Sequence, residues 1–80
     1  MELSEPVVEG TARDVGRRVH EAIWRRRIPQ TEVAGWLNMS QAAVSRRIQG
    51  FIPFDVVELQ KIADMLGLPI EDFFRGEPAA

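Results

Sequence analysis

The residues of this chain that could do chemistry are mostly arginines, and they are concentrated in its middle. Residues 13–50 carry eight arginines against three acidic residues, whereas both ends are acidic and the whole chain of 80 residues has a formal net charge of −2. A basic segment between acidic ends indicates a surface that binds a polyanion, although a solvated, arginine-rich helix face would give the same pattern.

Catalytic and metal-binding groups are sparse. The sequence has no cysteine and one histidine, His20. The lack of cysteine excludes disulfides, thiolate metal sites and thiol catalysis. The single imidazole of His20 lacks the further ligands that a metal needs. No nucleophile is sensibly spaced from a base, and no glycine-rich phosphate loop occurs. We therefore expect a protein that is not an enzyme and that uses no metal, cofactor or small-molecule ligand.

Targeting signals are not evident either. The first residues lack the charged-then-apolar pattern of a signal peptide, and no apolar run reaches the roughly 18–20 residues of a membrane helix. We expect a soluble, cytoplasmic protein with no membrane partner.

Five helices are predicted to position the arginines. Apolar residues recur at helical spacing over about residues 12–26, 30–37, 41–49, 56–66 and 70–74, and no stretch alternates as a strand does. Residues suited to helix ends flank these segments: Thr11 with Asp14, Ser40, Gly50, Asp55 with Glu58, and Gly67. The prediction is an all-α domain at residues 11–75, between a flexible acidic arm (1–10) and a frayed tail (76–80).

The second and third predicted helices are short and are joined by a tight turn. The small side chain of Ala34 allows close packing, and apolar Leu37 and Val44 on either side of the turn set the two axes steeply across each other. This arrangement projects the start of the third helix outward, where it can enter the major groove of DNA.

On these residues, the run from Val15 to Phe74 resembles the lambda-repressor/Cro (Xre-type) helix-turn-helix family. The matching features, in order, are Gln30, Ala34, Met39-Ser40-Gln41, Val44, Gly50, Leu59-x-x-Ile62-Ala63-x-x-Leu66-Gly67-Leu68 and Glu71-Asp72-Phe73. No one feature is specific, but the ordered set at these spacings is. The resemblance implies a five-helix, lambda-repressor-like fold whose third helix reads DNA.

The resemblance also implies which side chains read bases: Ser40, Gln41, Ala42, Ser45 and Arg46. In the family, the glutamine matching Gln30 contacts a phosphate and braces the glutamine matching Gln41. A carboxamide suits adenine, the alanine methyl suits thymine, and the Arg46 guanidinium suits guanine or falls back onto a phosphate.

Contacts to the DNA backbone are implied for Arg13, Arg17, Arg18, Gln30, Arg47 and Gln49. Two positions depart from the family. Arg47 stands where an apolar residue is usual, so that it either extends into solvent or adds a phosphate contact, and Pro29 stands where a Ser or Thr cap is common. Few polar groups follow Gln41, so specificity is expected to rest on Gln41, Arg46 and DNA shape.

Apolar residues outside the helical stripes predict a two-fold homodimer. The family usually has polar residues around the loop after the third helix. This chain instead has an apolar set that, with two residues of the last helix, would form an exposed patch of the kind that marks interfaces: Phe51, Ile52, Phe54, Phe73 and Phe74. The alternative is that several of these side chains close the core.

Two other groups of residues have simpler interpretations. Trp24 and Trp36 lie off the main apolar stripes and are predicted to be peripheral core residues. The run from Arg25 to Arg27 is predicted to complement the dipole at the end of the first helix, and the alternative is that it clamps phosphate.

From these residues we expect a sequence-specific regulator of transcription that binds double-stranded DNA: a Cro-like phage or bacterial repressor that occludes a promoter. A dimer would place two recognition helices about 34 Å apart on a pseudo-palindromic operator. A rival hypothesis of a different class is a protein-interaction module of the same fold, an antitoxin or anti-repressor. Such a module would hold its partner through the acidic C-terminal half or the apolar loop.

Overall fold

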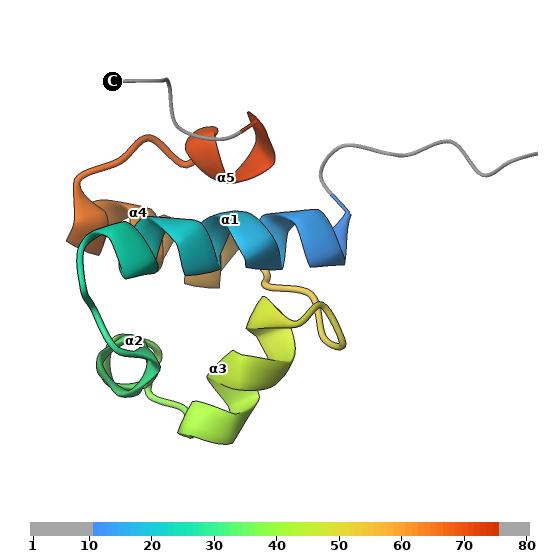
Figure 1. The fold of residues 1–80 in the computed structure, drawn as a ribbon, viewed down its shortest axis with the longest axis vertical. Coiled ribbons are helices and arrows are strands. Elements are labelled where there is room, and N and C mark those ends of the chain that lie inside the picture. Colours follow the sequence, from blue (N-terminus) through green and yellow to red (C-terminus); the bar gives the residue numbers. More distant parts are fainter. Residues whose placement is uncertain (1–10, 76–80) are drawn as a thin grey trace, which may run out of the picture.

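The computed structural model describes residues 11–75, which form five helices and no strand (Figure 1). They are α1 (Ala12–Arg25), α2 (Gln30–Leu37), α3 (Gln41–Ile48), α4 (Val56–Leu66) and α5 (Asp72–Arg75). All five predicted helices are confirmed, and α1 and α3 end one residue earlier than expected. The last helix begins two residues late, because Asp72 N–H donates to Pro69 O and Phe73 N–H to Ile70 O in a tight turn. The predicted arm and tail lie outside the described residues.

Local side-chain hydrogen bonds explain where most of the helices begin. Thr11 Oγ1 accepts from Asp14 N–H at 3.3 Å, and Ser40 Oγ accepts from Ala43 N–H at 3.1 Å. Asp55 and Glu58 form a complete capping box at the start of α4. The predicted caps are therefore confirmed, whereas α2 begins after Pro29 with no side-chain cap.

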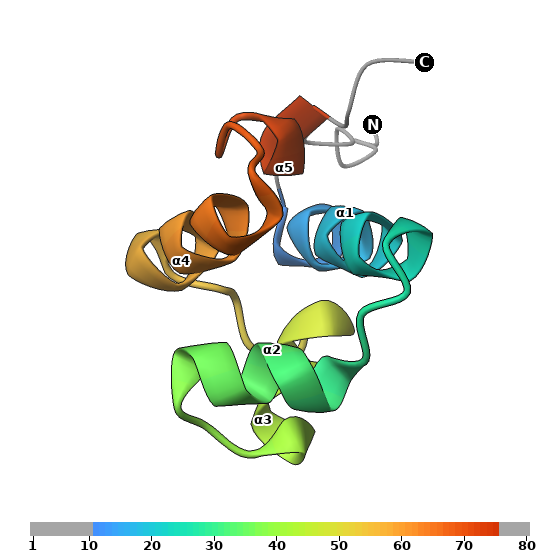
Figure 2. The same ribbon diagram turned by 90° about the vertical axis from the view of Figure 1, so that its left-hand side faces the viewer.

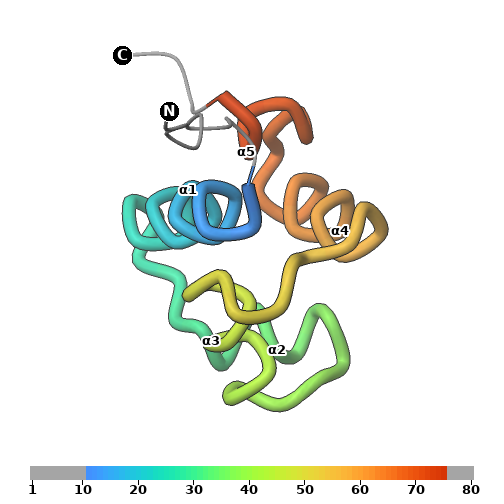
Figure 3. Tube along the Cα trace, turned by 90° about the vertical axis from the view of Figure 1, so that its right-hand side faces the viewer, coloured from blue at the N-terminus to red at the C-terminus, as the bar shows by residue number. Residues whose placement is uncertain are grey.

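The helices enclose one core in three layers. α1 and α4 lie side by side, α5 covers them on one side, and α2 with α3 covers them on the other (Figures 2 and 3). Every helix contributes to the buried apolar cluster, which comprises Val15, Val19, Ala22, Ile23, Val33, Ala34, Val44, Phe54, Leu59, Ile62, Ala63 and Phe73. None of the helices in the described part of the chain is long and apolar enough to cross a bilayer.

Two glycines let the first half of α1 approach the end of α3. A Cβ atom at Gly16 would overlap the carbonyl oxygen of Ile48 and lie 2.6 Å from that of Arg47. Gly50 has φ +88° and ends α3 as predicted, and a Cβ there would lie 2.8 Å from the Cα of Arg13. The end of α3 is thus held against α1 by direct backbone contact.

The core corrects two predictions about aromatic residues. Phe54 and Phe73 are 8% and 1% exposed, so they close the core and are not available to an interface. Trp36 is half-buried against the core, as expected, but Trp24 is 73% exposed and is not a peripheral core residue.

Candidate nucleic-acid interface

The turn between α2 and α3 has the compact geometry of a helix-turn-helix. α2 ends at Leu37, and Asn38 adopts the left-handed conformation with φ +56°. Met39 N–H then returns to Ala34 O at 3.1 Å, and Ser40 caps the next helix. An asparagine tolerates this conformation better than most residues, so three residues suffice to connect α2 to α3 in a tight turn.

The outer face of α3 is polar and accessible. Val44 is fully buried and anchors the helix, whereas Ala42 and Arg46, each two positions from it, lie on the other side. Ser40, Gln41, Ala42 and Arg46 are exposed, and Ser45 is half-buried. Their spacing places Ala42, Ser45 and Arg46 on one side of the helix, with Gln41 at its outer end. The structure thus brings the predicted set together on one accessible face.

Further along this face, Gln49 is exposed and its amide Nε2 donates to Ser45 Oγ at 2.8 Å. This hydrogen bond joins Gln49, which is predicted to contact the DNA backbone, to Ser45, which is predicted to read a base. Gln49 keeps its Oε1 and Ser45 keeps its hydroxyl hydrogen for further hydrogen bonds, so the bond holds their orientation without using up their capacity to bind a ligand.

Arg47 is held inside the protein. Its Nε donates to Glu58 Oε1 at 3.1 Å, its Nη1 donates to Ala43 O at 3.1 Å, and its side chain is only 18% exposed. Glu58 Oε1 also accepts from Asp55 N–H at 3.1 Å. The predicted phosphate contact of Arg47 is therefore wrong: this arginine ties α3 to the start of α4.

The arginines of α1 divide between two sides of the helix. Arg18 Nη1 donates to Phe74 O at 2.6 Å, so its guanidinium binds the end of α5, on the opposite side of α1 from α3. Arg18 is therefore no longer among the residues expected to contact the DNA backbone. Arg13 and Arg17 are exposed; the Cα of Arg13 adjoins Gly50, and Arg17 forms a 3.3 Å ion pair with Asp14 while its side chain stays 57% exposed.

Arg26 behaves as the dipole argument predicts. Its Nη1 donates to Ala22 O at 2.8 Å, which satisfies a carbonyl in the last turn of α1. Arg27 follows in the left-handed conformation with φ +56° and is exposed.

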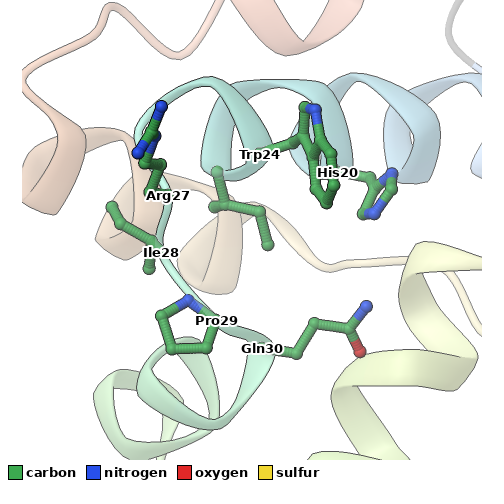
Figure 4. A pocket seen from close by; sticks show the side chains of 7 residues that line it. His20, Trp24, Arg27, Ile28, Pro29 and Gln30 are labelled. Carbon is green, nitrogen blue, oxygen red and sulfur yellow. The ribbon is translucent and has the colours of Figure 1, made fainter.

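Gln30, the first residue of α2, lines an open hollow between α1 and α2 (Figure 4). The other lining residues come from the second half of α1 and the segment that follows it: His20, Ile23, Trp24, Arg27, Ile28 and Pro29. No hydrogen bond joins Gln30 to Gln41 within the described residues, so the bracing of one glutamine by the other stays a prediction. Sequence reasoning missed this hollow, although the helical spacing of Arg17, His20 and Trp24 was a usable signal.

Apolar side chains are exposed around the loop after α3 and on α4. Phe51 is 75% exposed, Ile52 38% and Phe74 39%, and Val56 and Val57 at the start of α4 are each 65% exposed. Three of the five predicted interface residues are thus accessible, and two valines that the prediction omitted are accessible as well.

Residues 11–75 contain no group of three or more His, Cys, Asp or Glu side chains that could hold a metal ion.

One family model matches this chain. It is the BetR domain, and the match extends over residues 10–79, which includes all five helices. The BetR domain is a small helical, helix-turn-helix-like domain of transcriptional regulators. No curated protein matches the chain.

Proposed function

The chain belongs to the BetR domain family, and from this membership and the geometry of α2 and α3 we propose that it binds double-stranded DNA sequence-specifically and regulates transcription. α3 enters the major groove, and the turn from Leu37 to Ser40 sets its angle. The observation that carries the proposal is the polar, accessible outer face of α3.

Base readout is assigned to the outer face of α3. Gln41 accepts from N6 and donates to N7 of an adenine, Ala42 places its methyl group against a thymine, and Arg46 donates to O6 and N7 of a guanine. Ser40 at the start of α3 and Ser45, oriented by Gln49, complete the set.

Backbone contacts are assigned to Arg13 and Arg17 on α1, Gln30 at the start of α2, and Gln49 at the end of α3. They fix the position of the domain on DNA but carry no sequence information. Arg18 and Arg47 are left out of this set because each binds another helix of the protein.

We further propose that the regulator is a Cro-like repressor that acts as a homodimer on a pseudo-palindromic operator. Phe51, Ile52 and Phe74 are the accessible members of the predicted dimer patch. A dimer would offset the small number of bases that one eight-residue helix can read, because two half-sites are then bound at once.

A second candidate function is the capture of a partner protein, as by an antitoxin or anti-repressor. The observation in its favour is the exposure of the apolar side chains of Phe51, Val56 and Val57, none of which is assigned to a DNA contact above.

The test is selection of bound sequences from random duplex DNA by the purified protein, followed by titrations at two salt concentrations. We expect one enriched motif, and Gln41→Ala should weaken its binding by about 1–3 kcal/mol and relax the preference at one base pair. The matched control is Gln60→Ala, which removes an exposed glutamine of α4 and should leave both affinity and motif unchanged.

Each outcome of this selection has a definite meaning. A palindrome with half-sites one helical turn apart supports the dimer, and a single short site supports a monomeric DNA binder. The absence of any enriched sequence at either salt concentration would overturn the DNA-binding proposal and leave partner capture as the function to test.

A further inference from the structure

One face of α1 carries a row of exposed residues that suits an anionic polymer. Arg13, Arg17, His20 and Trp24 follow one another at spacings of four, three and four residues, so they lie in line along the helix. Arg27 continues the row just beyond the end of α1 and lines the hollow beside Trp24. All five residues are exposed, and the Arg13 end of the row adjoins Gly50 at the end of α3.

Trp24 is the unusual member of this row. Its side chain is 73% exposed, and its ring lies 6.2 Å from that of His20, centroid to centroid, with the two planes inclined at 37°. An indole buries on the order of 150–250 Å² when a partner covers it. Trp24 therefore contributes little to folding and has a large surface left for a ligand.

The hollow beside Trp24 lies between the second half of α1 and the start of α2. His20 and Trp24 extend from α1 in the direction of α2, and the amide of Gln30 extends toward α3 (Figure 4). Ile23, Ile28 and Pro29 supply apolar lining. The polar lining residues are His20, Arg27 and Gln30, and no carboxylate is among the lining residues.

We propose that this hollow holds the sugar–phosphate backbone of one DNA strand beside the bases read by α3. Gln30 donates to a phosphate, Arg17 and Arg27 flank it with positive charge, and the indole of Trp24 packs against an adjoining deoxyribose. The mixture of apolar surface, cationic and neutral donors, and the absence of carboxylates from the lining, match that backbone. This inference rests on the proposed function and adds Trp24, His20 and Arg27 to its contact surface.

The first experiment uses Trp24 as its own probe. In a Trp36→Phe variant, Trp24 is the single tryptophan, and its emission and its accessibility to acrylamide are followed as a non-specific duplex is added at low salt. Binding is monitored separately by the anisotropy of labelled duplex. We expect the emission to change and acrylamide quenching to fall in parallel with binding, because the DNA backbone covers the indole.

Two outcomes would overturn the inference in different ways. Binding with an unchanged Trp24 signal would mean that DNA lies elsewhere on the protein, and the proposed function would stand without this site. If neither random nor selected duplex is bound, the proposed function and the inference fail together, and the hollow becomes a candidate surface for a protein partner.

The second experiment measures what the contacts contribute. Trp24→Ala and Arg27→Gln should each weaken binding several-fold for all duplex sequences alike, and Arg27→Gln should lower the slope of log affinity against log salt by about 1. The matched controls, Met65→Ala and Lys61→Gln, alter residues of α4 that are also exposed and should change neither quantity.

Equal affinities for a variant and its control would contradict the assignment of that residue. A changed base preference in Trp24→Ala would do the same, because a backbone contact does not read sequence.

Discussion

α3 and α4 pack on the same core but are held there in different ways. α4 has 11 residues, begins with a capping box and buries Leu59, Ile62 and Ala63. α3 has eight residues and buries only Val44. It packs against α1 and α2, and its attachments include Val44 and Ile48 in or against the core, the close contact with Gly16 and the hydrogen bonds of Arg47. A helix that must present its outer face to a ligand has little surface left for packing, so each of its few attachments matters more.

The largest predicted effect breaks the contact between α1 and α3. Gly16→Ala should lower the free energy of unfolding by about 2–3 kcal/mol, because the new Cβ overlaps backbone atoms of Ile48 that cannot move independently of α3. Urea denaturation followed by circular dichroism measures it.

The same substitution at Gly35, in the exposed part of α2, is the matched control. No atom lies within 4 Å of a Cβ at that position, so Gly35→Ala should raise the free energy of unfolding by about 0.5–1 kcal/mol. Equal effects of the two substitutions would show that α3 does not depend on close approach to α1.

An intermediate effect is expected from breaking the link between α3 and α4. Arg47→Met should cost about 1–2 kcal/mol of stability, because Glu58 loses a charged donor while its side chain stays only 17% exposed. Glu58→Gln should cost less, because its amide oxygen can still accept from Asp55 N–H and Arg47 Nε.

The exposed pair of Arg17 and Asp14 is the control for this link. Arg17→Met should cost no more than about 0.5 kcal/mol, because the Arg17 side chain is 57% exposed and water screens the pair. If Arg17→Met lowered the free energy of unfolding as much as Arg47→Met does, the buried link between α3 and α4 would contribute no more to stability than an exposed ion pair.

Effects no larger than that of Arg47→Met are expected at the helix starts. Ser40→Ala removes the acceptor for Ala43 N–H and should cost about 1 kcal/mol, with faster amide exchange confined to the first turn of α3. Asp55→Ala removes one half of the capping box and should cost about as much, with its exchange confined to α4. If either variant raised the amide exchange rate equally in α3 and α4, the two helices would open as one unit.

The positions of all five helices could be predicted because their signals are local. Apolar spacing sets the buried side of each helix, and a cap such as Ser40 bonds within one turn. The same holds for the candidate site: Ala42 and Arg46 lie outward because each is two positions from Val44, which lies inward on the same short helix. Residues that share one helix keep a fixed relation, whichever tertiary structure surrounds them.

By itself, therefore, the sequence determined the all-α character of the described residues, the approximate extent of each helix and the polar outer face of the third helix. Only the tertiary structure decided which side chains are free to bind. Arg18 binds Phe74 O and Arg47 binds Glu58, while Phe54 and Phe73 enter the core and Trp24 stays outside it. Each of these outcomes depends on a partner from another helix, and local propensity carries no information about which distant segment will lie alongside.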